Sequence, residues 1–152
     1  MGVKIICENR KARFNYHILE DFEAGLVLQG SEVKSLRDGK GNLADSYAEV
    51  KGGELWLVNA HIAHYPAANQ FNHEPTRPRK ILMKRREIDR MGGKLAEKGL
   101  TLIPLSLYFK EGRVKVKLGL GKGKKAFDKR DSIKKRETDR ELRRMTKIKK
   151  GM

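Results

Sequence analysis

The run from Arg113 to Leu120 constrains the fold more than any other segment, because its residue types alternate in character. Val114, Val116, Leu118 and Leu120 take every second position, and Arg113, Lys115, Lys117 and Gly119 lie between them. Side chains of a strand point alternately to its two faces, so this run predicts a β-strand with one buried face. Residues 100–109 form a second strand candidate, and Lys110-Glu111-Gly112 between the two predicts a hairpin turn.

Other short apolar runs predict further strands. They are residues 16–19 and 26–28, on either side of an acidic stretch, and residues 46–50 and 55–62, joined by a Lys51-Gly52-Gly53-Glu54 turn. Residues 66–80 hold three of the four prolines and predict a long loop.

Two stretches predict helices inserted between these strands. Residues 31–37 predict a short helix with Ser31 as its N-cap and Asp38-Gly39 at its end. Residues 84–98 predict a longer helix that ends at Gly99. Because helices do not alternate strictly with strands, the pattern favours a mainly β protein, a small closed antiparallel barrel, over a parallel α/β sheet.

The basic charge divides the chain into two unequal parts. The formal net charge is +16; residues 122–152 hold 14 Lys/Arg and 5 Asp/Glu, a net of +9, and residues 1–121 hold the other +7. The last 31 residues carry few large apolar groups, so we expect this tail to be disordered alone. Acid–base pairs at helical spacing, such as Asp139 and Arg143, would support a helix on a polyanionic surface.

No residue pattern defines an enzyme. Glu20-Asp21-Glu23 has no adjacent nucleophile or proton shuttle and is interpreted as a solvated acidic edge. His61 and His64 are three apart on a predicted strand, so their imidazoles would diverge rather than share a metal. The glycine- and lysine-rich run 119–125 lacks the spacing of a nucleotide-binding loop. We therefore expect no catalytic residue, no metal and no cofactor.

Three basic groups with nearby aromatic residues indicate a polyanion site. The groups are residues 9–13, residues 77–80 with 84–86, and the basic positions of 113–125; the aromatic residues are Phe14, Tyr16, Tyr65 and Phe71. Aromatic rings stack on unpaired bases and lysines neutralise phosphates, so the composition favours an RNA-binding protein. No apolar run is long enough to span a bilayer, and one cysteine, Cys7, indicates a reducing cytoplasm.

Ordered sequence blocks resemble one family over residues 9–136. They include Phe22-Glu23-Ala24-Gly25-Leu26, Gly30-Ser31-Glu32-Val33-Lys34-Ser35-Leu36, Ala44-Asp45-Ser46-Tyr47, Arg79-Lys80-Ile81-Leu82, Gly121-Lys122-Gly123-Lys124-Lys125 and Asp128-Lys129-Arg130. The chain resembles the small protein B family, the SsrA-binding (tmRNA-binding) proteins of bacterial trans-translation.

The resemblance implies a fold and a function. The fold is a closed barrel of the oligonucleotide-binding type with about three inserted helices, forming an RNA-binding domain at residues 1–121 and a basic tail at 122–152. The barrel would bind the tRNA-like domain of tmRNA and deliver it to stalled ribosomes, with elongation factor Tu as a partner through alanyl-tmRNA. The tail would become helical in the empty mRNA channel beyond the decoding centre. No membrane partner and a cytoplasmic location are expected.

The resemblance also assigns roles to residues. The implied RNA-binding residues are Asn9, Lys11, Arg13, Tyr16, Glu23, Lys34, Arg79, Lys80, Leu82, Lys117, Lys122, Lys124 and Lys125. The implied ribosome-contacting residues are Phe127, Asp128, Lys129, Arg130, Lys134 and Arg136. Phe127 departs from the family, which often has His or Tyr there. The alternatives are a ribosomal or general single-strand RNA-binding module and, less favoured, a nuclease or RNA-modifying enzyme.

Overall fold

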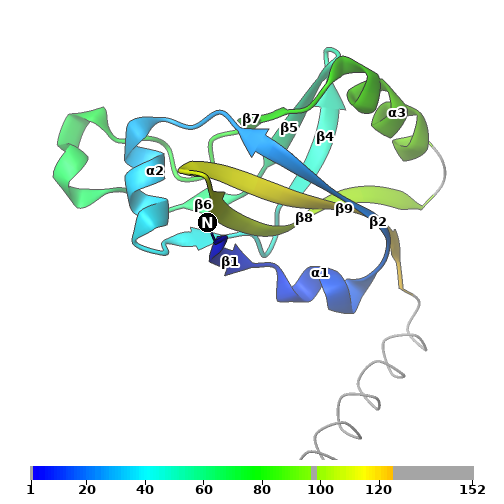
Figure 1. The fold of residues 1–152 in the computed structure, drawn as a ribbon, viewed down its shortest axis with the longest axis horizontal. Coiled ribbons are helices and arrows are strands. Elements are labelled where there is room, and N and C mark those ends of the chain that lie inside the picture. Colours follow the sequence, from blue (N-terminus) through cyan, green and yellow to red (C-terminus); the bar gives the residue numbers. More distant parts are fainter. Residues whose placement is uncertain (1, 97–98, 125–152) are drawn as a thin grey trace, which may run out of the picture.

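The computed structural model describes residues 2–96 and 99–124, so the predicted tail contacts and Lys125 lie outside the described residues. Figure 1 shows the fold. In chain order the elements are β1 (Lys4–Glu8), α1 (Arg10–Asn15), β2 (Tyr16–Leu26), α2 (Gly30–Arg37), β3 (Gly41–Asn42), β4 (Tyr47–Lys51), β5 (Glu54–Val58), β6 (His61–Ile62), the 3₁₀ helix η1 (Pro66–Phe71), β7 (Arg79–Leu82), α3 (Arg85–Leu95), β8 (Leu100–Lys110) and β9 (Arg113–Gly123). The prediction of a mainly β protein with inserted helices is confirmed.

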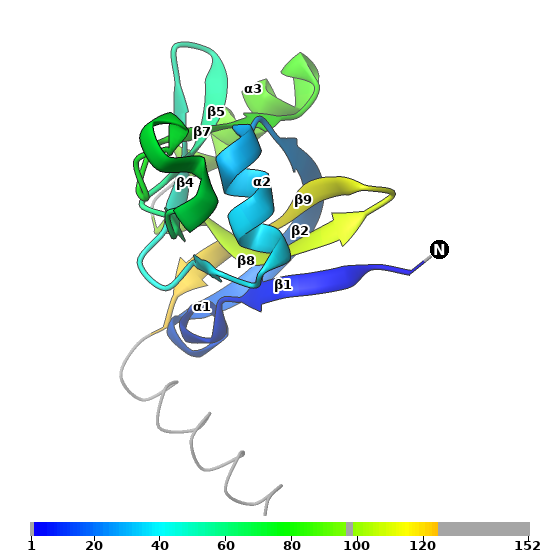
Figure 2. The ribbon, with the colours of Figure 1, turned by 90° about the vertical axis from the view of Figure 1, so that its left-hand side faces the viewer.

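The strands form one large antiparallel sheet and one small one. The large sheet has seven strands in the order β1-β8-β4-β5-β7-β2-β9, and β8 also pairs with β9. Following the pairings from β8 through β4, β5, β7, β2 and β9 therefore leads back to β8. The small sheet pairs β3 with β6. Figure 2, turned by 90°, shows how strongly the strands curve around one another.

The β8–β9 hairpin follows the predicted alternation. Val114, Val116 and Leu118 are buried, while Arg113 at the turn is exposed. The turn has two left-handed residues, Glu111 at φ 54° and Gly112 at φ 76°, as tight hairpins require. The register shifts between Pro104 and Ser106, so a bulge accommodates a proline that has no N–H to donate.

The main core is formed by side chains on one face of the curved large sheet, together with residues of α2 and α3. It contains Leu55, Leu57, Ile81, Leu102, Leu107, Val116 and Leu118 from the strands, Leu36 from α2, and Ile88 and Met91 from α3. In Figure 1, α2 and α3 lie at opposite ends of the sheet. Each fully buried aliphatic side chain stabilises the fold by ~1.5–3 kcal/mol, so this cluster is the principal source of stability.

A second, smaller core lies on the outer face of β8. Ala12 of α1 packs there with Ile103 and Leu105, and Tyr16 and Ile18 of β2 contact this cluster. The cluster fixes α1 against the sheet.

Within the described residues no helix has both the length and the apolar character needed to cross a bilayer.

Several sequence predictions differ from the structure. β1 and α1 were not predicted, and β2 runs unbroken through the acidic stretch, where two separate strands were expected. The expected strand over 55–62 is divided at Asn59, whose φ is 62°. The expected loop over 66–80 contains η1 and the start of β7.

The start of α2 also differs from its prediction. The N-cap is Gln29 rather than Ser31, and the Gln29 N–H donates to Oε1 of Glu32 at 2.8 Å. This carboxylate therefore satisfies a backbone donor at the open end of the helix.

Candidate nucleic-acid interface

Most of the predicted RNA-binding residues lie near one of the two ends of β2. Near its start lie Lys11, Arg13, Tyr16, Lys122 and Lys124, because Tyr16 pairs with Gly123 of β9. Near its end lie Glu23, which pairs with Lys117, and Leu82, which pairs with Gly25. Tyr16 and Gly25 are separated by about 30 Å of extended strand, so the two groups form distinct sites.

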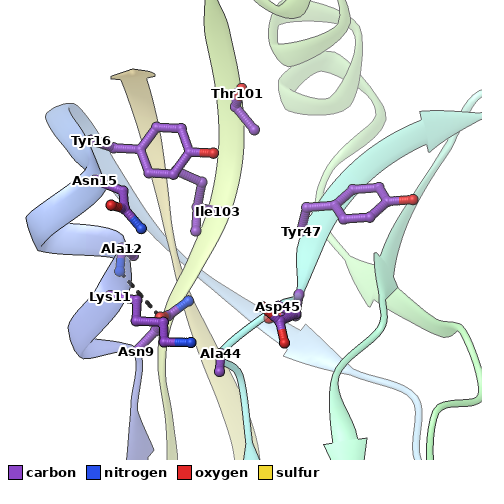
Figure 3. A pocket seen from close by; sticks show the side chains of 11 residues that line it. Asn9, Lys11, Ala12, Asn15, Tyr16, Ala44, Asp45, Tyr47, Thr101 and Ile103 are labelled. Carbon is purple, nitrogen blue, oxygen red and sulfur yellow. Dashed lines mark hydrogen bonds between the residues drawn. The ribbon is translucent and has the colours of Figure 1, made fainter. Parts of the chain in front are cut away.

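A cavity of about 460 Å³ opens at the start of β2, between α1 and the segment that enters β4. We call it the α1–β4 cavity. Its aromatic and apolar lining comes from Tyr16, Tyr47, Ile103, Ala12 and Ala44, and its polar lining includes Lys11, Asn15, Asp45 and Thr101. Figure 3 shows the Tyr16 ring extending across Ile103, with Asp45 on the opposite wall from α1.

Asn9 builds one wall of this cavity instead of facing outward. It is 5% exposed. Its side-chain oxygen accepts from the Ala12 N–H at 3.2 Å and caps α1. Its amide donates to the carbonyls of Leu43 at 3.1 Å and Pro104 at 3.0 Å. Asn9 was expected on the RNA-facing surface, but its hydrogen bonds are satisfied within the protein.

At the other end of β2, Glu23 is held in a hydrogen-bonded cluster. The Tyr108 hydroxyl donates to Oε2 of Glu23 at 2.5 Å, and Lys110 Nζ lies 3.3 Å from Oε1. The hydrogen bond from Tyr108, helped by Lys110, holds the pKa of Glu23 below its usual range. Burial and the contact with Glu23 raise the pKa of Tyr108 above its usual range. Tyr108 and Lys110 therefore hold the Glu23 carboxylate in place as a hydrogen-bond acceptor that lies close to basic side chains.

A cleft lined by both apolar and basic residues adjoins this cluster. Leu82, at 51% exposed, lies over Gly25, where a β-carbon would contact the Leu82 side chain at 3.5 Å. The cleft has a volume of about 250 Å³, and Lys115 and Arg113 line its rim. An exposed leucine beside lysines and a carboxylate offers apolar contact, positive charge and a hydrogen-bond acceptor in one place.

Arg79 also differs from its predicted role, because it lies entirely inside the protein at 0% exposed. Its Nε donates to Oε2 of Glu32 at 2.5 Å, and Arg77 donates to Oε1 of the same carboxylate at 2.5 Å. Further donations reach the carbonyls of Ala60 and Pro75. Burial alone would raise the pKa of Glu32, but hydrogen bonds from Arg77 and the Gln29 N–H and the charge of Arg79 outweigh it, so the pKa is lowered. Arg79 therefore ties α2 to β7 rather than presenting its charge to a ligand.

The remaining predicted residues are at the surface. Lys34 on α2 is exposed, with its ammonium 5.7 Å from the centre of the Tyr65 ring. Lys80 on β7 pairs with Glu54 at 3.1 Å. Glu20, grouped with Glu23 as an acidic edge, instead accepts from Arg90 at 2.7 Å and Lys94 at 2.9 Å, and so links β2 to α3.

Sequence reasoning gave no role to Asn15, Asp45, Tyr47 or Tyr108. Asp45, Tyr47 and Tyr108 lie in blocks that carry the family resemblance, Tyr108 in Leu105-Ser106-Leu107-Tyr108, and this was the one available signal. Among the residues that the structure describes, no group of three or more His, Cys, Asp or Glu side chains could hold a metal ion.

The fold and the surface together define a class: a mainly β protein built on one antiparallel sheet, with basic side chains around a cavity and a cleft at its surface. The family model described as "SmpB protein" matches residues 6–148. The chain therefore belongs to the SmpB protein family.

Individual relatives agree with this assignment. The SsrA-binding protein of Desulforudis audaxviator is 62% identical over 141 residues, covering 93% of this chain and 92% of that protein. The SsrA-binding protein of Carboxydothermus hydrogenoformans is 60% identical over 139 residues, covering 91% and 93%. A chain of the solved structure described as "tmRNA-SmpB: a journey to the center of the bacterial ribosome" matches with a TM-score of 0.67 and 51% identity, covering 79% of this chain and 85% of that one.

Proposed function

We propose that this protein binds the tRNA-like domain of tmRNA and delivers it to stalled ribosomes for trans-translation. The observation that carries the proposal is the 51% identity and TM-score of 0.67 to a chain of a tmRNA–SmpB structure. The basic side chains around the α1–β4 cavity and beside Leu82 support it, because phosphate neutralisation dominates the affinity of proteins for RNA. We also infer that the sheet is a closed barrel of the oligonucleotide-binding type, since its pairings return to β8.

We assign the RNA contacts to the exposed and half-buried members of the predicted set. They are Lys11, Arg13, Tyr16, Glu23, Lys34, Lys80, Leu82, Lys117, Lys122 and Lys124, with Lys125 outside the described residues. Asn9 and Arg79 are buried, so we assign them a structural role, in which their hydrogen bonds hold the elements that carry this surface.

Residues 122–152 are proposed to contact the ribosome, in the empty mRNA channel and at the decoding centre. Phe127, Asp128, Lys129, Arg130, Lys134 and Arg136 carry this part of the proposal, which rests on sequence resemblance and charge. Elongation factor Tu would join through alanyl-tmRNA, the cytoplasm would be the location, and the protein itself would perform no covalent step.

Sequencing of co-purified RNA tests the central claim. We expect one tRNA-like species to dominate, because a surface shaped for that fold selects it from cellular RNA. Recovery of random fragments, with equal affinity for unstructured RNA, would instead identify a general single-strand RNA-binding module.

Truncation after Gly123 tests the division of labour. The truncated protein should keep most of its affinity for the tRNA-like domain, because it lacks only Lys124 and Lys125 among the assigned RNA contacts, while peptide tagging on stalled ribosomes should stop. Loss of RNA binding on truncation would place the main RNA contacts in the tail. In both proteins log affinity should fall with log salt, with a slope of roughly −0.7 to −0.9 per neutralised phosphate.

A further inference from the structure

We propose that the α1–β4 cavity binds one unpaired guanine base of a bound RNA. This inference rests on the proposed function, in that it assumes an RNA ligand, and it adds a site and a base identity. It concerns Asp45 and Asn15, to which sequence reasoning gave no role.

The shape and lining of the cavity suit a nucleobase. Its volume of about 460 Å³ lies within the range of ~300–1,000 Å³ usual for pockets that bind small molecules. The Tyr16 ring is half-buried, packed on one side against the outer core at Ile103 and lining the cavity on the other. Unpaired bases stack on such fixed aromatic rings, because every base offers a π-face. Ile103 and Ala12 complete an apolar wall beside this ring.

The polar groups in the cavity favour guanine over other bases. Asp45 is exposed on the wall opposite α1, and among the described residues its carboxylate has no hydrogen-bond partner. A carboxylate only accepts, and its two oxygens match two adjacent N–H donors. Guanine alone presents a ring N–H and an amino group side by side on its pairing edge. Uracil places a carbonyl on each side of its single N–H, and those carbonyls would face the negative charge.

The opposite wall supplies complementary donors. Lys11 and Asn15 are four residues apart on α1, so both project from the same face of the helix toward the segment that carries Ala44 and Asp45, as Figure 3 shows. The Asn15 amide can donate to the guanine carbonyl oxygen, and the Lys11 ammonium can reach a flanking phosphate.

The surroundings favour RNA over a cationic protein side chain as the occupant. A carboxylate beside an aromatic ring would also suit an arginine. However, Lys11 lines the cavity, Arg13 is exposed on the same helix, and Lys122 is exposed next to Gly123, the partner of Tyr16. These charges repel a second cation and attract the phosphates on either side of a base.

Oligonucleotides that differ by one base test the proposal with the full-length protein. We compare a 12-residue oligouridylate with two versions whose central base is guanine or inosine, the latter lacking only the exocyclic amino group. Fluorescence anisotropy should show the guanine version binding at least about fivefold more tightly than the other two. In Asp45→Asn this preference should fall to within about twofold, because an amide presents its own donors to the base.

Matched measurements separate base reading from general effects. Asp89→Asn, the same exchange on α3, should keep the preference for guanine over inosine. Tyr16→Ala should weaken all three oligonucleotides together, since stacking is common to every base.

Affinity for the tRNA-like domain of tmRNA is measured in parallel, so that the two proposals fail separately. Tight binding of that RNA with equal affinity for guanine, inosine and uracil overturns the guanine site and leaves the proposed function intact. A preference that survives in Asp45→Asn also overturns the site, because the reading group would then lie elsewhere. Failure to bind any RNA tightly overturns both proposals.

Discussion

At the scale of single residues, the glutamates of this protein differ in what surrounds them. Glu23 lies at the surface with Tyr108 and Lys110 as partners, whereas Glu32 is buried between Arg77 and Arg79. A partly exposed carboxylate retains acceptor capacity for a ligand, while a buried one is consumed by its partners. We therefore propose that Glu23 contributes to recognition, whereas the buried ion pairs of Glu32 contribute to stability.

Tyr108 should act on RNA binding through Glu23. In Tyr108→Phe the carboxylate loses its principal donor, so its pKa should rise toward the usual value and its orientation should loosen. Affinity for the tRNA-like RNA should fall roughly fivefold. A carboxyl titration by NMR should show Glu23 ionising at higher pH in the variant than in the original protein. Tyr65→Phe is the matched control, and equal titration of Glu23 in all three proteins would contradict the positioning role.

Arg79 should contribute stability rather than RNA affinity. Arg79→Met leaves Glu32 buried without one of its two positive partners, which should lower the free energy of unfolding by ~3–5 kcal/mol. The neighbouring Lys80→Gln removes only an exposed pair with Glu54 and should cost less than ~1 kcal/mol. Urea unfolding followed by the fluorescence of Trp56 measures both. Similar losses in the two variants would show that the buried network is unimportant.

At the scale of elements, β9 depends on glycines where it packs against residues of the smaller core. A β-carbon at Gly119 would lie 2.9 Å from Leu105 Cδ1 and 3.1 Å from Ile18 Cγ2, both in the smaller core. Gly119→Ala should therefore lower the free energy of unfolding by ~1–3 kcal/mol through overpacking. Gly123→Ala has no atom within 4 Å of the added carbon and should be nearly neutral. Thermal unfolding of the two variants measures the difference, and equal stability would mean that Leu105 moves aside freely.

The elements that the sequence predicted are those whose own residues carry a regular pattern of apolar and polar side chains. The β8–β9 hairpin and α3 were predicted because their apolar spacing repeats over enough residues to define a face. α1 has only Ala12 buried within its six residues, so its sequence shows no repeating spacing of apolar residues that would predict a helix. β2 contains Glu20, Asp21 and Glu23, which disfavour a strand locally, but pairing with β9 along its length outweighs that preference.

The candidate sites were harder to predict because their partners are far apart in sequence. Asn9 looked like a member of a basic surface group, yet it donates to Leu43 and Pro104, 34 and 95 residues later in the chain. Arg79 looked exposed within a loop, yet its ion partner Glu32 lies 47 residues earlier. Local composition does not reveal such partners. The sequence therefore did not predict that Asn9 and Arg79 are buried.

At the scale of the whole molecule, acid should destabilise the protein through several carboxylates together. Hydrogen bonds from Lys94 and Arg90 lower the pKa of Glu20, and the pKa values of Glu23 and Glu32 are also lowered. A carboxyl with a lowered folded pKa stabilises the protein fully above its usual value of ~4.5 and loses that contribution as pH falls through the folded value. Urea unfolding between pH 7 and pH 3 should therefore show a decline that begins near pH 5.

A substitution separates the buried contribution from the surface ones. Glu32→Gln should be less stable at pH 7 and should lose less further stability on acidification, because the group that titrates has been removed. Glu54→Gln, at an exposed position, should follow the profile of the original protein. Parallel profiles for all three proteins would assign the acid sensitivity to net charge alone.

The position of β8 has a consequence for how the molecule opens. Ten of its eleven residues pair with β9 along one edge, with Leu105 left out at the bulge, and its other edge is divided between β1 and β4. An amide proton of β8 that donates to β9 or to β1 exchanges with solvent only after that ladder has separated, whereas the two-residue pairing of β3 with β6 can break independently. In deuterated water the inner amides of β8 should be the last to exchange, at the rate set by global unfolding. The separation of β8, the strand that contributes to both cores, would then be the step that limits the rate of global unfolding.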